Sequence, residues 1–278
     1  MPPERVEAHE PIVGETAAGS VRRMFGVADD GLVRWLTIDN QPRRNAIPFD
    51  GWAVLAGLIG EFSESEARVL VITGAGEDFC SGADMGSAVS GGAAAGRYAA
   101  MAKVSAAAAA LHRSTKPTIA AVDGVAVGAG MNLALGCDVV IATDRARFSE
   151  IFVKRGLTVD FGGTWLLPRL AGMARAKELA LTGRMFGADE AQRYGLVTEV
   201  VTPGDLVRAA GEMAAELAAG APLAQRFIKE GLDRSFEMSF GEALAYEQQA
   251  QSVLFTSEDV IEGVSAFLQK RPPEFKGR

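Results

Sequence analysis

Cysteine and histidine are scarce in this chain, and their scarcity excludes several kinds of site. The 278 residues include two cysteines, Cys80 and Cys137, and two histidines, His9 and His112. The cysteines form no CxxC pair, so we expect no disulfide framework and a reducing, cytoplasmic setting. Neither histidine has a second histidine or a cysteine at ligand spacing, so we expect no metal site.

Long apolar runs and basic runs are missing as well. No window reaches the about 18 uninterrupted apolar residues of a membrane-spanning helix. Residues 1–20 lack the apolar centre of a signal peptide and read as a loosely held tail. The net charge is −7, and no basic run could follow a nucleic-acid backbone. We therefore expect neither a membrane nor a nucleic acid as partner.

Three common motifs of enzymes and nucleotide-binding proteins are absent. The stretch GAGEDF has Phe79 where a dinucleotide-binding GxGxxG motif needs its third glycine. The chain has no GxxxxGK[ST] phosphate loop and no GxSxG nucleophile elbow. A dinucleotide site, a nucleotide-triphosphate loop and a serine hydrolase are therefore not expected.

The patterns that are present predict an α/β protein. Residues 32–42 alternate as a strand does, residues 49–62 have helical spacing, and residues 68–76 form a β-branched run closed by glycine. The stretches PTIAAVDG and DVVIATD predict two further buried strands, with a short helix at MNLALGC between them. After Arg169 helical patterns dominate, so the chain runs from mixed α/β to mostly α.

Two segments strongly resemble the enoyl-CoA hydratase/isomerase family, also called the crotonase superfamily. They are VLVITGAGEDFCSGADM, residues 69–85, and KPTIAAVDGVAVGAGMNLALGCDVVIATDRARFS, residues 116–149. The likeness continues through GLTVDFGGTWLLPRLAG and ends in EGVSAFLQKRPPEFKGR, so it covers roughly residues 32–278. Several motifs in the right order make this match specific, whereas any one alone would be weak.

The resemblance implies a fold and an assembly. The fold is a crotonase-like ββα spiral, an α/β core expected at residues 21–205 after the tail at residues 1–20. Residues 206–278 correspond to a C-terminal helical trimerisation region. Family members are usually trimers or dimers of trimers, so we expect a homotrimer or a dimer of trimers.

The family's chemistry gives the glycine-rich loops a purpose. Its members bind an acyl-CoA thioester and stabilise an enolate-like oxygen with two backbone N–H groups. By position these donors are the amides of Ala83 and Ala129, and Gly82 and Gly128 let the thioester approach the backbone. Taken singly, either loop is also explained as an ordinary tight turn.

The CoA moiety is the only cofactor-like group that the resemblance implies, and a few placed cations would bind it. The matching positions are Arg43, Arg44 and Ala46 along the pantetheine and phosphate path, Ser81, Ala83 and Asp84 in the loop that wraps the adenine and pantetheine, and Phe267 and Lys270 in the nucleotide pocket of a neighbouring subunit. The simpler reading is solvated arginines and a frayed C-terminal helix. Residues 86–97, rich in glycine and alanine, are expected to shape the acyl pocket as a lid.

The family's hydratases use two glutamates, and this chain has neither. Asn132 and Phe152 occupy those positions. Hydration needs a base to activate water and an acid to protonate carbon, and neither an amide nor a benzyl group exchanges a proton in this way. Hydration by the usual mechanism is therefore not expected.

Asp160, in GLTVDFGGT, is the remaining candidate base. It matches the position at which some dienoyl-CoA and ring-opening isomerases of the superfamily carry a catalytic aspartate. One carboxylate suits an isomerase, because it can remove a proton at one carbon and return it at another. We therefore predict double-bond or ring isomerisation with Asp160 as proton shuttle.

Other readings of these positions remain open. Asp160 is also a suitable N-cap for a helix at GGTWLLPRL. Glu150, two residues before Phe152, would reach the pocket if that segment is extended. A hydratase with an unconventional base and a non-catalytic acyl-CoA-binding subunit are the alternative functions.

Overall fold

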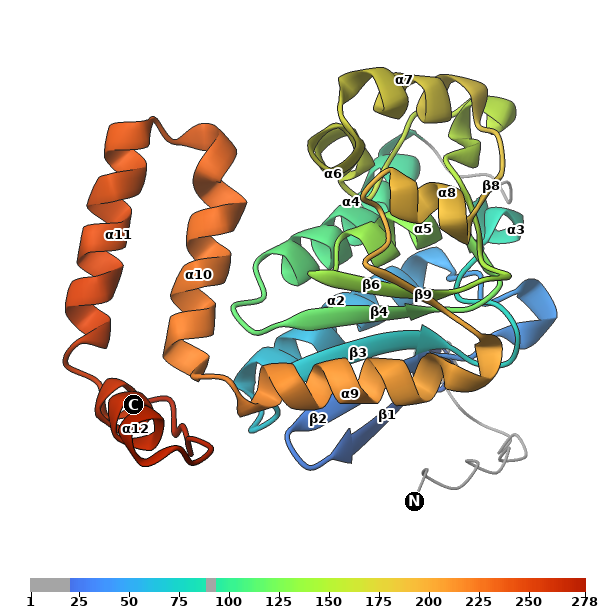
Figure 1. Cartoon of the computed structure of the whole chain (residues 1–278). Helices are drawn as coiled ribbons and strands as arrows, with labels where there is room; N and C mark the ends of the chain where they lie inside the picture. The colour runs from blue at the N-terminus through green and yellow to red at the C-terminus, as the bar shows by residue number, and fades with distance from the viewer. Residues whose placement is uncertain (1–20, 89–93) are drawn as a thin grey trace.

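The computed structural model describes residues 21–88 and 94–278, and a six-stranded sheet lies at its centre (Figure 1). The strand order is β1-β2-β3-β4-β6-β9; β1 pairs antiparallel with β2, and the other pairs are parallel. The strands are β1 Phe25–Asp30, β2 Val33–Ile38, β3 Val69–Gly74, β4 Thr118–Val122, β6 Val139–Thr143 and β9 Glu199–Val201. The expected tail at residues 1–20 and residues 89–93 of the expected lid lie outside the described ranges.

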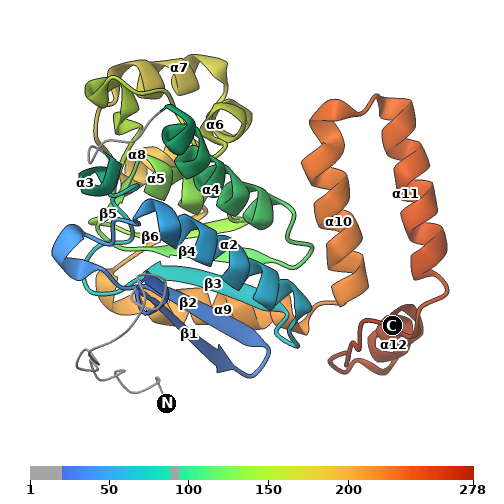
Figure 2. The ribbon, with the colours of Figure 1, turned by 180° about the vertical axis from the view of Figure 1, so that it is seen from behind.

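Helices cover both faces of this sheet (Figure 2). On β3, Leu70 and Ile72 belong to the core shared with α2, α4 and α5, whereas Val69 and Val71 pack with α9. The covering helices are α2 Phe49–Glu64, α4 Ala94–His112, α5 Ala129–Leu135 and α9 Leu206–Ala219. Burial on both faces explains why β3 is a continuous apolar run instead of an alternating one.

A smaller layer follows the carboxyl ends of the central strands. Two residues, Asp123 and Gly124, separate β4 from β5, and three separate β6 from β7. The strands β5 Val125–Val127, β7 Arg147–Ser149 and β8 Phe186–Gly187 form a second sheet. The helices of this layer are α3 Met85–Ala88, η2 Ile151–Arg155, α6 Gly163–Ala171, α7 Met173–Thr182 and α8 Ala188–Arg193. The edge of a parallel sheet at which its strands end is where α/β proteins usually bind ligands.

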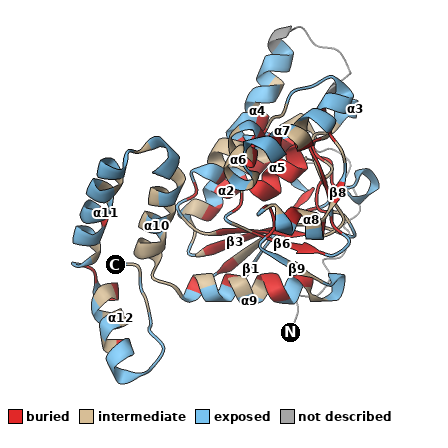
Figure 3. Cartoon of the chain, turned by 45° about the horizontal axis from the view of Figure 1, so that its top comes forward, coloured by how far each residue is buried: buried red, intermediate tan, exposed pale blue. Residues whose placement is uncertain are grey.

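The C-terminal helices project from this core as an arm (Figures 1 and 3). The arm consists of α10 Pro222–Arg234, α11 Phe240–Leu254 and α12 Glu258–Gln269. A capping box starts α11: the Ser239 hydroxyl accepts a hydrogen bond from the Glu242 N–H, and the Glu242 carboxylate accepts one from the Ser239 N–H. Figure 3 shows the arm largely exposed, in contrast to the buried sheet and α5.

The expected fold class is confirmed. The predicted strands at residues 32–42 and 68–76 and the predicted helix at residues 49–62 correspond to β2, β3 and α2. The strands β5, β7 and β8 were not predicted, because runs of two or three residues carry no periodic signal. The expected division at residue 206 stays a prediction; α9, which follows it, packs against the sheet.

Hydrogen bonds from Lys116, two residues before β4, connect it to the C-terminal end of α2. Its Nζ donates to the backbone oxygens of Phe62 (3.1 Å), Ser65 (2.6 Å) and Ala67 (2.9 Å). The last carbonyl groups of a helix have no partner within the helix, so this ammonium group supplies donors that they need. We expect Lys116→Met to lower the free energy of unfolding by about 2–3 kcal/mol in urea titrations.

Lys103→Met is the matched control for this prediction. Lys103 also forms an ion pair, with Asp50, but its side chain is 40% exposed and that of Asp50 is 68% exposed. Exposed pairs contribute little, so the control should lose less than about 1 kcal/mol. Equal losses in the two variants would show that the Lys116 hydrogen bonds stabilise the fold no more than an exposed ion pair does.

Candidate active site

A cavity of about 820 Å³ opens beside the small layer, next to α4. Its walls come from the loop after β3, the start of α5, η2, the loop before α6 and residues of α4. The predicted site residues that line it are Arg44, Ser81, Gly82, Ala83, Gly128, Ala129 and Asp160. The fold therefore brings residues from four separate segments of the sequence to one place.

The two predicted oxyanion donors both face this cavity with free amides. Ile47 N–H donates to Gly82 O, and Ile47 O accepts from Asp84 N–H, both at 2.9 Å. These two bonds hold Ala83, which lies between Gly82 and Asp84 in the chain. Ala129 is the first residue of α5, where a helical N–H has no acceptor within the helix. In the described part of the chain neither amide has a protein acceptor. Such a pair is suited to hold an oxyanion.

Gly82 allows the two donor loops to approach each other. It has a φ of +95°, and a Cβ atom there would lie 2.7 Å from Val127 O and 3.4 Å from Ala129 N. An L side chain at this position would be strained and would push the loops apart. Glycine is therefore required at position 82 for two reasons, the positive φ and the close approach of the two donor loops.

Several predicted CoA-binding residues do not line the cavity. The Arg43 guanidinium pairs with the Asp84 carboxylate at 3.2 Å, and Ala46 is buried. Phe267 and Lys270 lie on α12 and at its C-terminal cap, across the molecule from α3 (Figure 1). Phe267 and Lys270 are expected to contact CoA bound to a neighbouring subunit. Because the structure contains one subunit, this role stays a prediction.

Asp160 lines the cavity and does not cap α6. That helix has Gly162 as its N-cap and no side-chain cap, so the capping interpretation is wrong. Phe161 beside it adopts a φ of 50° and packs against Trp52, with ring centroids 5.2 Å apart. A left-handed conformation in a bulky residue is held only by such surrounding contacts. Packing therefore fixes the loop that carries Asp160.

The carboxyl group of Asp160 has a buried oxygen and a raised pKa. Its Oδ1 is buried and has no hydrogen-bond partner. Burial raises the pKa of Asp160 to about 6. A carboxylate with a pKa near neutrality is a better base than an exposed aspartate and is still ionised at pH 7.

Asn132 and Phe152, at the positions of the family's glutamates, are placed differently from each other. Phe152 lines the cavity and is 6% exposed, so it offers an apolar wall. Asn132 is fully buried behind the wall, where its Nδ2 donates to Asp160 O (3.0 Å) and to Glu150 Oε2 (3.3 Å). Glu150 is also fully buried and does not line the cavity.

Much of the remaining cavity wall could not be found from the sequence. These residues include Phe49, Met101, Arg155, Leu157 and Met185, which come from α2, α4, η2 and the segments after η2 and before β8. No local pattern distinguishes them from other surface or core positions. Arg97, within the expected lid, also lines the cavity.

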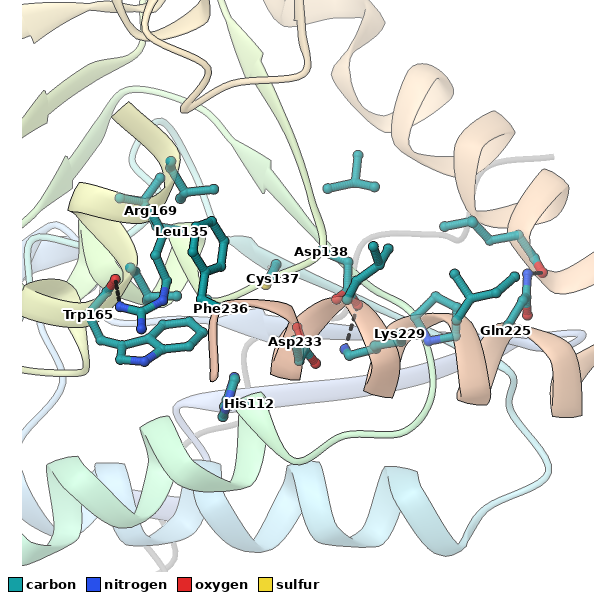
Figure 4. Close-up of a pocket in the computed structure, with 18 residues that line it drawn as sticks. His112, Leu135, Cys137, Asp138, Trp165, Arg169, Gln225, Lys229, Asp233 and Phe236 are labelled. Carbon is teal, nitrogen blue, oxygen red and sulfur yellow. Dashed lines mark hydrogen bonds and ion pairs between the residues drawn. The ribbon is translucent and has the colours of Figure 1, made fainter. Parts of the chain in front are cut away.

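A second cavity of about 530 Å³ lies between α10 and α6 (Figure 4). Two of its cationic groups have partners: Lys229 Nζ lies 2.6 Å from Asp138 Oδ2, and the Arg169 guanidinium lies 3.8 Å from the centroid of the Trp165 ring. None of the predicted site residues lines it. We therefore assign the chemistry to the first cavity.

Within residues 21–88 and 94–278, no group of three or more His, Cys, Asp or Glu side chains is arranged to hold a metal ion. None of the described helices combines the length and apolar character needed to cross a bilayer.

Comparison with known proteins relates residues 31–278 to the family model described as enoyl-CoA hydratase/isomerase. The short-chain-enoyl-CoA hydratase of Clostridium acetobutylicum is 38% identical over 90% of this chain and 96% of its own. The 1,2-epoxyphenylacetyl-CoA isomerase of Escherichia coli is 37% identical over 88% of this chain and 95% of its own. The crystal structure of an enoyl-CoA hydratase from Bacillus anthracis is similar with a TM-score of 0.88, at 32% identity, over 92% of this chain and 100% of that one.

Proposed function

Because this chain belongs to the enoyl-CoA hydratase/isomerase family, we propose that it isomerises a double bond or a ring in an acyl-CoA thioester, with Asp160 as the proton shuttle. The observation that carries the proposal is the position of Asp160. It is the one acidic side chain among the described residues that line the cavity. A site with one base and a pair of free amides suits proton transfer between two carbons.

The proposed reaction uses the site in two steps. The thioester oxygen accepts hydrogen bonds from the N–H groups of Ala83 and Ala129 while the Asp160 carboxylate removes a proton from one carbon. The resulting dienolate carries its charge on that oxygen, and Asp160 returns the proton to another carbon. Each amide donor contributes about 3 kcal/mol to stabilising such an oxyanion. No cofactor beyond the CoA moiety takes part.

Overall similarity does not choose between isomerase and hydratase. The named hydratase and the named isomerase are 38% and 37% identical to this chain. The side chains favour isomerisation, because hydration needs two proton-transfer groups at the reacting carbons. Phe152 supplies none, and Asn132 lies behind the cavity wall.

Deuterium exchange tests the proposal. The protein is incubated in D₂O with a panel of 3-enoyl-, dienoyl- and epoxyacyl-CoA thioesters, and with crotonyl-CoA. We expect an isomerised product from the panel and no hydration of crotonyl-CoA; deuterium at the α- or γ-carbon measures how far the proton on Asp160 exchanges with solvent before it is returned. Conversion of crotonyl-CoA to a 3-hydroxyacyl product would instead establish a hydratase with an unconventional base. Binding of every thioester without chemistry would establish a non-catalytic acyl-CoA-binding subunit.

The exposed surface of the arm supports an assembly of several subunits. Large apolar side chains are exposed along it, namely Ile228, Leu232, Phe236, Phe240, Phe255, Ile261, Phe267 and Leu268. Apolar patches of this kind are typical of protein–protein interfaces. We therefore propose a homotrimer or a dimer of trimers, in which Phe267 and Lys270 complete the nucleotide pocket of a neighbouring subunit. Light scattering on the purified protein tests this, and a monomer would contradict it.

A further inference from the structure

Three buried oxygens without hydrogen-bond partners lie on connected residues beside the cavity. They are Asn132 Oδ1, Glu150 Oε1 and Asp160 Oδ1. The Asn132 Nδ2 connects the three residues, since it donates to both Glu150 Oε2 and the backbone oxygen of Asp160. Buried polar atoms without partners are costly, so a cluster of them at a site calls for a functional reason.

Glu150 is rigidly held at the back of this cluster. Two hydrogen bonds hold Ser149, the residue before it: Gly128 N–H donates to Ser149 O (2.9 Å), and Ser149 Oγ donates to Gly183 O (3.0 Å). The side chain is fully buried, and in the described part of the chain no cation pairs with it. A charged carboxylate in such a place costs far more than a neutral carboxyl group.

The Asn132 side chain contacts three residues, Glu150, Asp160 and Gly163. Besides its two hydrogen bonds, it packs against Gly163, the first residue of α6. A Cβ atom on Gly163 would lie 2.3 Å from Asn132 Nδ2 and 2.5 Å from its Oδ1. The carboxamide is therefore in tight contact with the start of α6, and its Nδ2 donates to Glu150 and Asp160.

We propose that Glu150 is a positioning residue: its uncharged carboxyl group accepts a hydrogen bond from Asn132, which in turn holds the backbone of the Asp160 loop. The proposal rests on the proposed role of Asp160 as proton shuttle. Glu150 does not touch substrate, because it does not line the cavity.

The charges around Glu150 agree with this role. The elements packed against it are α5, the loop before α6 and the turn after α7. The charged group that acts on Glu150 from them is Asp160, which repels a second negative charge. Burial first, and then the charge of Asp160, raise the pKa of Glu150 to about 8, although the Asn132 hydrogen bond opposes the shift. Between about pH 6 and about pH 8 the site therefore carries one negative charge, on the group that must accept the proton.

Two substitutions separate positioning from mere packing. Glu150→Gln keeps a neutral acceptor for Asn132, and Glu150→Met keeps the volume without an acceptor. We expect Glu150→Gln to lose less than about threefold in kcat and Glu150→Met to lose about tenfold or more at unchanged KM. The acid limb of the pH–rate profile should be the same in Glu150→Gln as in the original protein.

Two readouts do not depend on activity, so they remain informative if the proposed isomerisation fails. At pH 6.5, infrared spectra should contain a protonated-carboxyl band that Glu150→Gln removes and that the exposed control Glu199→Gln retains. The pKa of Glu150 is raised from 4.5 to about 8 on folding, so its contribution to stability should fall as pH rises through that range. The Tm advantage of Glu150→Gln should therefore grow from pH 5 to about pH 9.

Three results would overturn the proposal. One is an infrared spectrum in which Glu150→Gln removes no such band. Another is an acid limb that moves down by about one pH unit or more in Glu150→Gln, because Glu150 would then be ionised beside Asp160. The third is a Glu150→Met protein with the original kcat.

Discussion

Replacing Asp160 by asparagine should lower the kcat of isomerisation by about 10²–10⁴-fold, the range that a general base contributes. The amide keeps the size of the side chain but cannot accept and return a proton at neutral pH. Binding of the acyl-CoA ester should persist, because the amides of Ala83 and Ala129 remain in place. Rapid-quench turnover and equilibrium titration with the same thioester measure the two effects separately.

The pH dependence of the original protein follows from the same group. The Asp160 carboxyl has a pKa of about 6 and must be ionised to take a proton. The rate kcat/KM should therefore be nearly constant above pH 7 and fall tenfold per pH unit well below pH 6. A profile that stays flat down to pH 4.5 would assign the base to a different group.

The same substitution should stabilise the fold. Because the pKa of Asp160 is higher in the folded chain than the usual 3.8, ionisation of this group reduces stability as pH rises from about 4 to about 6. The full cost above pH 6 is up to about 3 kcal/mol, and Asp160→Asn avoids it. Thermal unfolding at pH 7 should therefore give a higher Tm for Asp160→Asn.

Asp30→Asn is the matched control for both effects. Asp30 is exposed at the end of β1, so its replacement removes one negative charge without touching the cavity. We expect its rate and its Tm to equal those of the original protein. Full turnover in Asp160→Asn would refute the proton-shuttle role, even if the stability change were observed.

The sequence could predict the parts of this molecule that depend on local pattern or on family motifs. The apolar run of β3 and the spacing of α2 identify those elements, since burial leaves a periodic signature. The loops at Gly82 and Gly128 could be matched as an ordered set, and the structure places both at one cavity. Asp160 could be predicted as the base because Asn132 and Phe152 stand where the family's hydratases have their two glutamates.

The parts that could not be predicted depend on contacts between distant segments. Asn45, for example, is fully buried, and its Nδ2 donates to Ala75 O (2.9 Å) and Asp78 O (2.6 Å) across two loops. Nothing in its immediate neighbours distinguishes it from a surface turn residue. Glu150 was recognised only as a candidate for the pocket, because sequence spacing does not show that its side chain is fully buried and accepts a hydrogen bond from Asn132 instead of lining the cavity.

Replacing Ala129 by proline should remove one of the two oxyanion donors at little cost in folding. Ala129 follows the N-cap Gly128, and this first helical position tolerates proline because its N–H has no helical partner. The proline has no N–H, and its ring also occupies the space into which the donor points. We expect kcat to fall by about 10²–10³-fold, the usual effect of losing one oxyanion donor.

The matched control is Met173→Pro, which places proline at the same position of another helix. Met173 follows the N-cap Gly172 of α7, is 59% exposed and does not line the cavity. If proline at a helix start were itself harmful, both variants would lose stability and activity together. A selective loss of turnover in Ala129→Pro, with Tm values for the two variants close to the original, would identify the Ala129 amide as a donor to the reacting oxygen. Ala129→Pro with turnover within a fewfold of the original would instead mean that the oxygen is held elsewhere, because a proline nitrogen has no hydrogen to give.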